Sequence, residues 1–184
     1  MASVNILLSG GIDSTALVHL YLSQGIAVLG FHVNYGQPTA EREMASAYAV
    51  AAYYDIPLTM ARIQPTPGMR GDEFLCRNAL LVLAACSSLA PGSNRVAIGI
   101  HSGTPYYDCS SGFLQDMQRI LDGYYGGLVT VEAPFLQWTK PEIFHYCKKY
   151  GVPIHLTYSC ERNGDHPCGQ CPSCHDRGRL LETE

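Results

Sequence analysis

The sequence predicts an α/β protein with a doubly wound, parallel, five-stranded sheet. Two observations lead to this prediction. Strand patterns and helix patterns alternate along the chain. The strand patterns are almost continuously apolar, as expected of strands that helices cover on both faces of a sheet. At 184 residues the chain is predicted to form one domain, 1–184, with a cysteine-rich appendix at 159–184.

The first half of the chain begins this alternation. Strands are expected at 4–8, 27–34 and 58–63, and helices at 14–23, 39–54 and 74–90. The second helix is rich in alanine and has Glu41 and Glu43 in its first turn, where acidic side chains favour the helix dipole. A proline-containing loop is expected at 64–71, and Pro91 is expected to end the third helix.

The second half continues the pattern with strands at 95–100 and 128–132, a polar loop at 101–111, and helices at 111–125 and 139–150. The last helix has the clearest start signal, because Thr139 can cap it, Pro141 suits its first turn and Glu142 completes a capping box. Ligands of such sheets bind beyond the carboxyl ends of the strands, where the strand order reverses. The turn after the first strand is therefore expected to line a ligand site.

That turn has the composition of a phosphate-binding loop. Gly10 and Gly11 let the backbone turn sharply and approach an anion, and the free N–H groups of the following helix attract the same anion. Asp13 is expected either to cap this helix or to face a magnesium ion. The residues predicted to bind a nucleotide here are Ser9, Gly10, Gly11, Asp13, Ser14 and Thr15.

The loop differs from two common nucleotide motifs. It lacks the Gly-Lys-Ser/Thr ending of a Walker loop, and it lacks the G-x-G-x-x-G of a dinucleotide fold. Ser-Gly-Gly-Ile-Asp-Ser instead resembles the PP-loop of the N-type ATP pyrophosphatases, which split ATP between its α and β phosphates. A ligand-free turn with an aspartate cap is the structural alternative.

Four cysteines near the C-terminus have the spacing of a metal site. Cys160 is followed by Cys168, Cys171 and Cys174, and the last three form a C-x2-C-x2-C pattern. Four thiolates would hold Zn²⁺ in a closed tetrahedral site that leaves no position open for catalysis. We therefore expect a structural zinc knuckle, with an iron–sulfur cluster or disulfides as the alternatives.

The composition excludes several classes of protein. Hydrophobic residues make up 47% of the chain and charged residues 15%, which indicates a globular rather than a disordered chain. The net charge of −4 disfavours a nucleic-acid partner, which clustered lysines and arginines would bind. No apolar run is long enough to span a membrane and no signal peptide is visible, so a cytoplasmic protein is expected.

Further motifs follow in the order of a known family. Asn-Tyr-Gly-Gln comes after the second predicted strand, Arg-Asn opens the third helix, Asp-Cys lies in the polar loop and Lys-x-Glu opens the last helix. With the two terminal motifs, nearly the whole chain resembles the 7-cyano-7-deazaguanine synthase (QueC) family. The resemblance implies an adenine-nucleotide α-hydrolase-like fold, a homodimer, and ATP, Mg²⁺ and Zn²⁺ as cofactors.

The resemblance also implies an ATP-dependent ligase. It would adenylate 7-carboxy-7-deazaguanine, add nitrogen from ammonia and form 7-cyano-7-deazaguanine, with release of AMP and pyrophosphate. The implied catalytic residues are Asp13, Arg77 and Lys140; Asn34, Gln37 and Gly99 would bind the nucleotide, and Asn78 and Asp108 the substrate. The structural alternatives are an ion pair of Arg77 with Asp72 or Glu73, a solvated Lys140, and a turn formed by Asp108.

Several positions around the expected acceptor depart from the family pattern: Pro38, Thr39, Cys76 and His101. These departures leave other functions open. The chain would also suit a QueC-like antiviral-defence enzyme that joins the deazaguanine acid to a protein amine. A non-catalytic nucleotide-sensing module and a tRNA-modifying PP-loop enzyme are two further hypotheses, and a thiolation enzyme would need a reactive Cys76 or Cys109.

Overall fold

The computed structural model describes residues 2–63, 74–90, 92–101, 103–164 and 166–182. Within these ranges, five parallel strands form one sheet in the order β3-β2-β1-β4-β5. The strands are β1 (Ser3–Leu7), β2 (Ala27–Asn34), β3 (Leu58–Arg62), β4 (Arg95–Ala97) and β5 (Thr130–Glu132). The strand order reverses between β1 and β4, which confirms the predicted doubly wound sheet.

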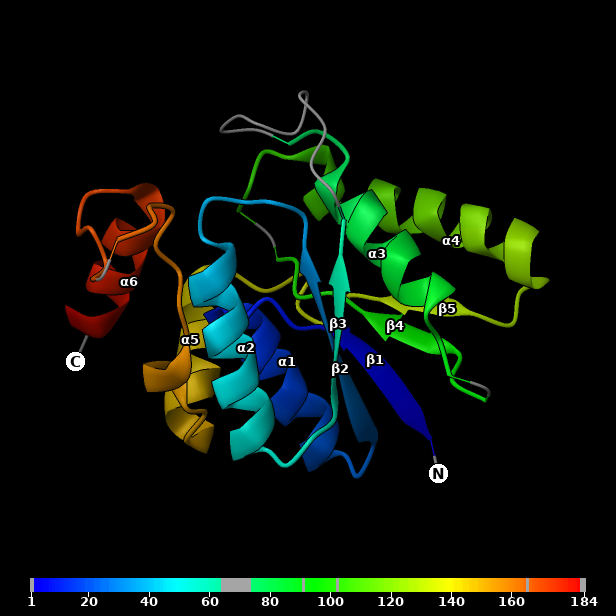
Figure 1. Ribbon diagram of the computed structural model, residues 1–184, viewed down its shortest axis with the longest axis horizontal. Coiled ribbons are helices and arrows are strands. Elements are labelled where there is room, and N and C mark those ends of the chain that lie inside the picture. The colour runs from blue at the N-terminus through cyan, green and yellow to red at the C-terminus, as the bar shows by residue number, and fades with distance from the viewer. Residues whose placement is uncertain (1, 64–73, 91, 102, 165, 183–184) are drawn as a thin grey trace.

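Helices cover both faces of this sheet (Figure 1). On one face lie α1 (Ile12–Ser23), α2 (Ala40–Tyr53) and α5 (Lys140–Tyr150), and on the other lie α3 (Arg77–Ser87) and α4 (Ser111–Tyr125). Each face has its own cluster of buried apolar side chains, with Leu8, Val18 and Ile143 in the first and Phe31, Val82 and Leu121 in the second. The strands are apolar on both sides because both sides pack against helices.

The start of α5 forms the capping box that the sequence predicts. The Thr139 side chain accepts a hydrogen bond from the Glu142 N–H, and the Glu142 carboxylate accepts one from the Thr139 N–H at 2.7 Å. Pro141 occupies the first turn, where a missing N–H has no cost. These local contacts set the position of Lys140, the first residue of the helix.

Some elements differ from the sequence prediction. α3 begins at Arg77 instead of residue 74, because Cys76 has a left-handed backbone (φ 63) that a right-handed helix cannot contain. β4 ends at Ala97 instead of residue 100, and β5 begins at Thr130 instead of residue 128. A further helix, α6 (Pro172–Glu182), lies in the appendix and was not predicted.

Figure 1 places α6 at the end of the molecule beyond α2 and α5, opposite α4. The predicted loop at 64–71 lies outside the described residues, and so do Asp72 and Glu73. No helix within the described ranges is both long and apolar enough to cross a membrane.

Candidate functional site

The turn between β1 and α1 lies where the strand order reverses, and its shape depends on Gly10. The φ angle of Gly10 is 85°, a conformation that side chains rarely adopt. A Cβ atom there would lie 2.7 Å from the Glu43 carbonyl oxygen and from the Ser46 Cβ, so α2 would also exclude it. Gly11 has a φ of −82° and room for a Cβ, whose nearest neighbour would be the Ser9 Oγ at 3.4 Å.

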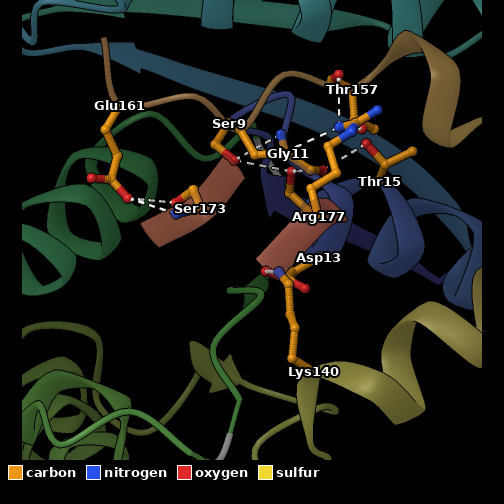
Figure 2. Close-up of polar contacts among 11 residues, drawn as sticks. Ser9, Gly11, Asp13, Thr15, Lys140, Thr157, Glu161, Ser173 and Arg177 are labelled. Carbon is orange, nitrogen blue, oxygen red and sulfur yellow. Dashed lines mark hydrogen bonds and ion pairs between the residues drawn. The ribbon is translucent and has the colours of Figure 1, made fainter. Parts of the chain in front are cut away.

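The hydroxyl groups of this turn, which we call the phosphate loop (residues 9–15), hold its shape. The buried Thr15 and Ser14 hydroxyls donate to the Gly11 carbonyl at 2.8 and 3.1 Å, and the Ser9 Oγ accepts from the Gly11 N–H at 3.2 Å (Figure 2). The N–H groups of residues 12–14 open α1 and have no partner within the helix. They are the groups that the loop offers to an anion.

An ion pair closes one side of the loop. The Lys140 Nζ lies 2.5 Å from the Asp13 Oδ2, and both side chains are mostly buried (Figure 2). The other oxygen, Asp13 Oδ1, is buried and has no hydrogen-bond partner among the described residues. A carboxylate oxygen of this kind suits Mg²⁺, which prefers hard oxygen ligands. The expectations of an Asp13 cap and a solvated Lys140 are wrong: the cap position belongs to Gly11, without a side-chain hydrogen bond.

Gly99 lies behind the start of α1, just after β4. A Cβ at this position would come within 3.2 Å of the Asp13 carbonyl carbon and the Ser14 nitrogen. The missing side chain therefore lets the first turn of α1 pack directly on the end of β4. The Ile98 N–H still donates to the Glu132 carbonyl at 2.9 Å, so β4 pairs with β5 up to the last residue of β5.

Asn34 and Gln37 shape the turn that follows β2. The Asn34 Oδ1 accepts a hydrogen bond from the Gly36 N–H at 2.9 Å. The Gln37 Oε1 accepts from the Tyr35 N–H at 3.0 Å, and its Nε2 donates to the Glu43 Oε2 at 2.8 Å. The two side chains thus tie this turn to itself and to α2, next to Gly10.

A second group of predicted residues gathers at the start of α3. The buried Asn78 donates to the Asp108 carbonyl at 3.1 Å, and the exposed Arg77 donates to the Asn78 Oδ1 at 3.4 Å. Burial raises the pKa of the nearby Cys109 thiol; Thr104 and Arg77 lower it, but burial with the Asp108 and Asp13 carboxylates outweighs them. The structure therefore groups Arg77, Asn78 and Asp108 at the start of α3, and the raised pKa favours the protonated form of Cys109.

A cavity of about 500 Å³ adjoins the Asp13–Lys140 pair. It lies between the starts of α1 and α5, the residues His101, Gly103 and Thr104, and α6, which contributes Arg177. Sequence reasoning missed both α6 and Arg177, because the cysteine spacing describes metal ligands and carries no helical periodicity. One signal for Arg177 was its position three residues after Cys174, a spacing that would place both residues on the same face of a helix.

The four predicted metal ligands meet in one cluster. Their sulfur atoms all lie within 4.8 Å of one another, and the Cys168 and Cys174 Sγ atoms are 4.0 Å apart. Zn–S bonds of about 2.3 Å in a tetrahedron would separate sulfur atoms by about 3.8 Å, so the cluster fits zinc. All four thiols are free, which argues against the disulfide interpretation.

Backbone N–H groups stabilise the sulfur atoms of this cluster. The Cys160 Sγ accepts from the N–H groups of Arg162 and Cys168, each at 3.4 Å. Burial opposes ionisation of Cys160, but these donors lower its pKa to about 6. Burial and the neighbouring thiols raise the pKa of Cys174 to about 12. Full ionisation of the cluster therefore requires a cation, and zinc bound by four thiolates would be structural.

Comparisons with known proteins agree with this geometry. The model of the family described as "Queuosine biosynthesis protein QueC" matches residues 3–71 and 73–183. A 7-cyano-7-deazaguanine synthase of Nautilia profundicola is 29% identical over 99% of this chain and 94% of its own length. Another, of Synechococcus sp. CC9605, is 33% identical over 95% of this chain and 90% of its own length.

Among solved structures, an NMN synthetase from Francisella tularensis has a similar fold. The TM-score is 0.58 with 16% sequence identity, over 88% of this chain and 68% of the synthetase. At this identity the similarity concerns the fold alone.

Proposed function

The chain belongs to the QueC family of queuosine biosynthesis proteins, and we propose that it is an ATP-dependent ligase that converts 7-carboxy-7-deazaguanine into 7-cyano-7-deazaguanine. The observation that supports this most is the Asp13–Lys140 pair beside the N–H groups of residues 12–14, which have no partner within α1. It combines a cation, a carboxylate oxygen for magnesium and a helix start at a single point. Adenylation by ATP needs these groups together, because negative charge develops on the phosphates.

In the proposed first step, a carboxylate oxygen of the substrate attacks the α-phosphorus of ATP, and the bond to pyrophosphate breaks. The N–H groups of residues 12–14 stabilise the phosphate oxygens, and Lys140 neutralises charge at the α-phosphate. Magnesium bound at the Asp13 Oδ1 would add Lewis-acid stabilisation of the leaving pyrophosphate. The products of this step are an acyl-adenylate and pyrophosphate.

In the proposed second step, ammonia attacks the acyl carbon and AMP leaves, which forms an amide. The amide oxygen then attacks the α-phosphorus of a second ATP and a second pyrophosphate leaves; loss of AMP and a proton from the adenylated amide gives the nitrile. No covalent enzyme intermediate is needed, which agrees with the protonated Cys109 thiol and disfavours a thiolation reaction. The protein mainly positions the reactants and neutralises charge.

The deazaguanine acid is proposed to bind near the start of α3. Asn78 and Asp108 are joined there by a hydrogen bond, with Arg77 beside them. The rings of Tyr35 and Phe74 lie 5.7 Å apart next to this group and offer aromatic surface to a planar base. Arg77 is the proposed partner of the substrate carboxylate, since an arginine binds a carboxylate through two parallel hydrogen bonds.

The test is product analysis with ATP, 7-carboxy-7-deazaguanine and ammonia. We expect the nitrile, AMP and pyrophosphate by mass spectrometry and chromatography. Asp13→Asn should lower turnover by about 100-fold or more with the melting temperature nearly unchanged. Asp122→Asn, an exposed carboxylate change on α4, is the matched control and should retain activity. ADP and phosphate as products would refute the proposal.

A protein amine as the acceptor is a second candidate. The observation that favours it is the strained, exposed Cys76 directly before Arg77, one of the positions that depart from the family pattern. Competition between ammonia and a peptide amine decides between the acceptors. Nitrile without a peptide adduct supports ammonia as the acceptor, and a peptide adduct supports a protein amine. ATP binding without release of AMP would instead indicate a nucleotide-sensing module.

A further inference from the structure

The Arg177 side chain of α6 donates hydrogen bonds to several groups of the preceding segment. Its NH1 group lies 3.2 Å from the Thr157 carbonyl, 2.9 Å from the Thr157 Oγ1 and 3.2 Å from the Ser159 Oγ. Its NH2 group donates to the Ile154 carbonyl at 2.8 Å. One guanidinium group thus holds the backbone and side chains of the segment 154–159, as Figure 2 shows in part.

The held segment also contacts the phosphate loop. The Tyr158 N–H donates to the Gly10 carbonyl at 3.0 Å. The Ser46 hydroxyl of α2 donates to the Leu156 carbonyl, two residues earlier. The segment therefore lies between α6 on one side and the loop and α2 on the other. Releasing it from Arg177 would free the group that orients the Gly10 carbonyl.

The same segment leads directly into the cysteine cluster. Cys160 follows Ser159, and Cys174 lies one helical turn before Arg177 on α6. The Glu161 carboxylate also accepts hydrogen bonds from the Ser173 N–H and hydroxyl at 3.1 and 2.7 Å (Figure 2). The knuckle therefore fixes α6, and α6 fixes the segment.

We propose that Arg177 is a positioning residue that holds the phosphate loop in its ATP-binding conformation through the segment 154–159. The proposal rests on the proposed function, because it takes ATP as the ligand of the loop. Arg177 lines the same cavity as Asp13, but its NH1 and NH2 groups are engaged by protein acceptors. It acts through Tyr158 and Gly10 instead of contacting the nucleotide.

The expected kinetic effect follows from the fraction of molecules with a competent loop. When that fraction falls, the apparent dissociation constant of ATP rises in proportion, while bound molecules still react. Arg177→Met keeps the apolar stem and removes the donors. It should raise both Kd and KM for ATP by about 10-fold or more and leave kcat within about threefold. Arg177→Lys should rescue part of the loss.

The experiment measures four quantities on each variant: the ATP Kd by titration calorimetry, steady-state kinetics, zinc content, and amide hydrogen exchange at Tyr158. Arg177→Met should accelerate exchange at Tyr158 without loss of zinc. Arg179→Met removes an exposed arginine of the same helix and is the matched control, expected to behave as the wild type.

Several results would overturn the proposal. They are an unchanged Kd and exchange rate in Arg177→Met, or a fall in kcat at constant KM. If Arg177→Met does not fold, Thr157→Val removes one acceptor of the same arginine and should show the same changes at smaller size. If the wild type binds no ATP, the proposed function fails, while the exchange at Tyr158 still tests the coupling without nucleotide.

Discussion

The phosphate loop and the cysteine knuckle are both short turns at helix starts, but different forces hold them. The loop is held by packing. Gly10 packs against α2, Gly99 lies directly against the first turn of α1, and the Ser14 and Thr15 side chains are buried. The knuckle is held by N–H···S contacts, and most of the residues between Cys160 and Cys171 are exposed. The loop should therefore keep its shape without a ligand, whereas the knuckle should depend on its metal.

Metal removal tests this difference with the largest expected effect. Structural zinc contributes about 10–16 kcal/mol in small zinc-binding peptides, so Cys171→Ser or chelation should disorder residues 160–182. Amide exchange should rise throughout this range and stay slow in β1, and elemental analysis should show loss of zinc. Cys76→Ser, an exposed cysteine outside the cluster, is the control. Iron in the wild type would contradict the zinc assignment.

The stability of the phosphate loop should depend on side-chain volume at its glycines and not on the metal. Gly10→Ala forces a left-handed residue against the Glu43 carbonyl and should cost about 2–4 kcal/mol of unfolding free energy, with loss of ATP turnover. Gly11→Ala meets nothing closer than 3.4 Å and should change stability by less than about 1 kcal/mol. Urea unfolding of the two variants measures the difference. Equal effects would mean that packing does not hold the loop.

Acid should lower the unfolding free energy of the sheet domain through Glu132, at the end of β5. Burial raises the pKa of this carboxyl, but hydrogen bonds from Arg95 and Tyr21, at 2.7 and 2.5 Å, outweigh burial and lower it below the usual 4.5. A lowered folded-state pKa gives stability that is present above pH 4.5 and is lost as the pH falls through the folded value.

Tyr21→Phe removes one of these donors, so it should destabilise the protein at pH 6 and progressively less toward pH 3. Unfolding free energies across this range give the comparison. Tyr54→Phe is the matched control, since the buried Tyr54 hydroxyl has no hydrogen-bond partner among the described residues. A Tyr21→Phe effect that is independent of pH would show that Glu132 does not titrate as inferred.

The smallest expected effect is a gain in stability at Cys76. Its φ of 63° costs a side-chain-bearing residue about 1 kcal/mol, and its side chain is exposed, so little packing is lost by removing it. Cys76→Gly should therefore stabilise the fold by up to about 1 kcal/mol, measured by urea unfolding. Cys76→Ala keeps the strain and should show no such gain.

Much of the fold could be predicted because its signals are local. Alternating apolar and helical segments indicated every strand of the sheet, and Thr139, Pro141 and Glu142 indicated the start of α5. Errors arose where a tertiary contact decided a boundary. α3 starts late because Cys76 is left-handed, and β4 ends early because its neighbour β5 ends at Glu132.

The sequence by itself determined the alternation of elements, the glycine and hydroxyl residues of the loop Ser9–Thr15 and the four cysteines of the knuckle, since periodicity and spacing act over a few residues. The tertiary structure alone decided which distant groups meet. Lys140 pairs with Asp13, which lies 127 residues earlier in the chain. Arg177 binds the segment 154–159, which in turn donates a hydrogen bond to the Gly10 carbonyl. Such contacts depend on the strand order and on how α5 and α6 pack, and no local pattern in the chain encodes that arrangement.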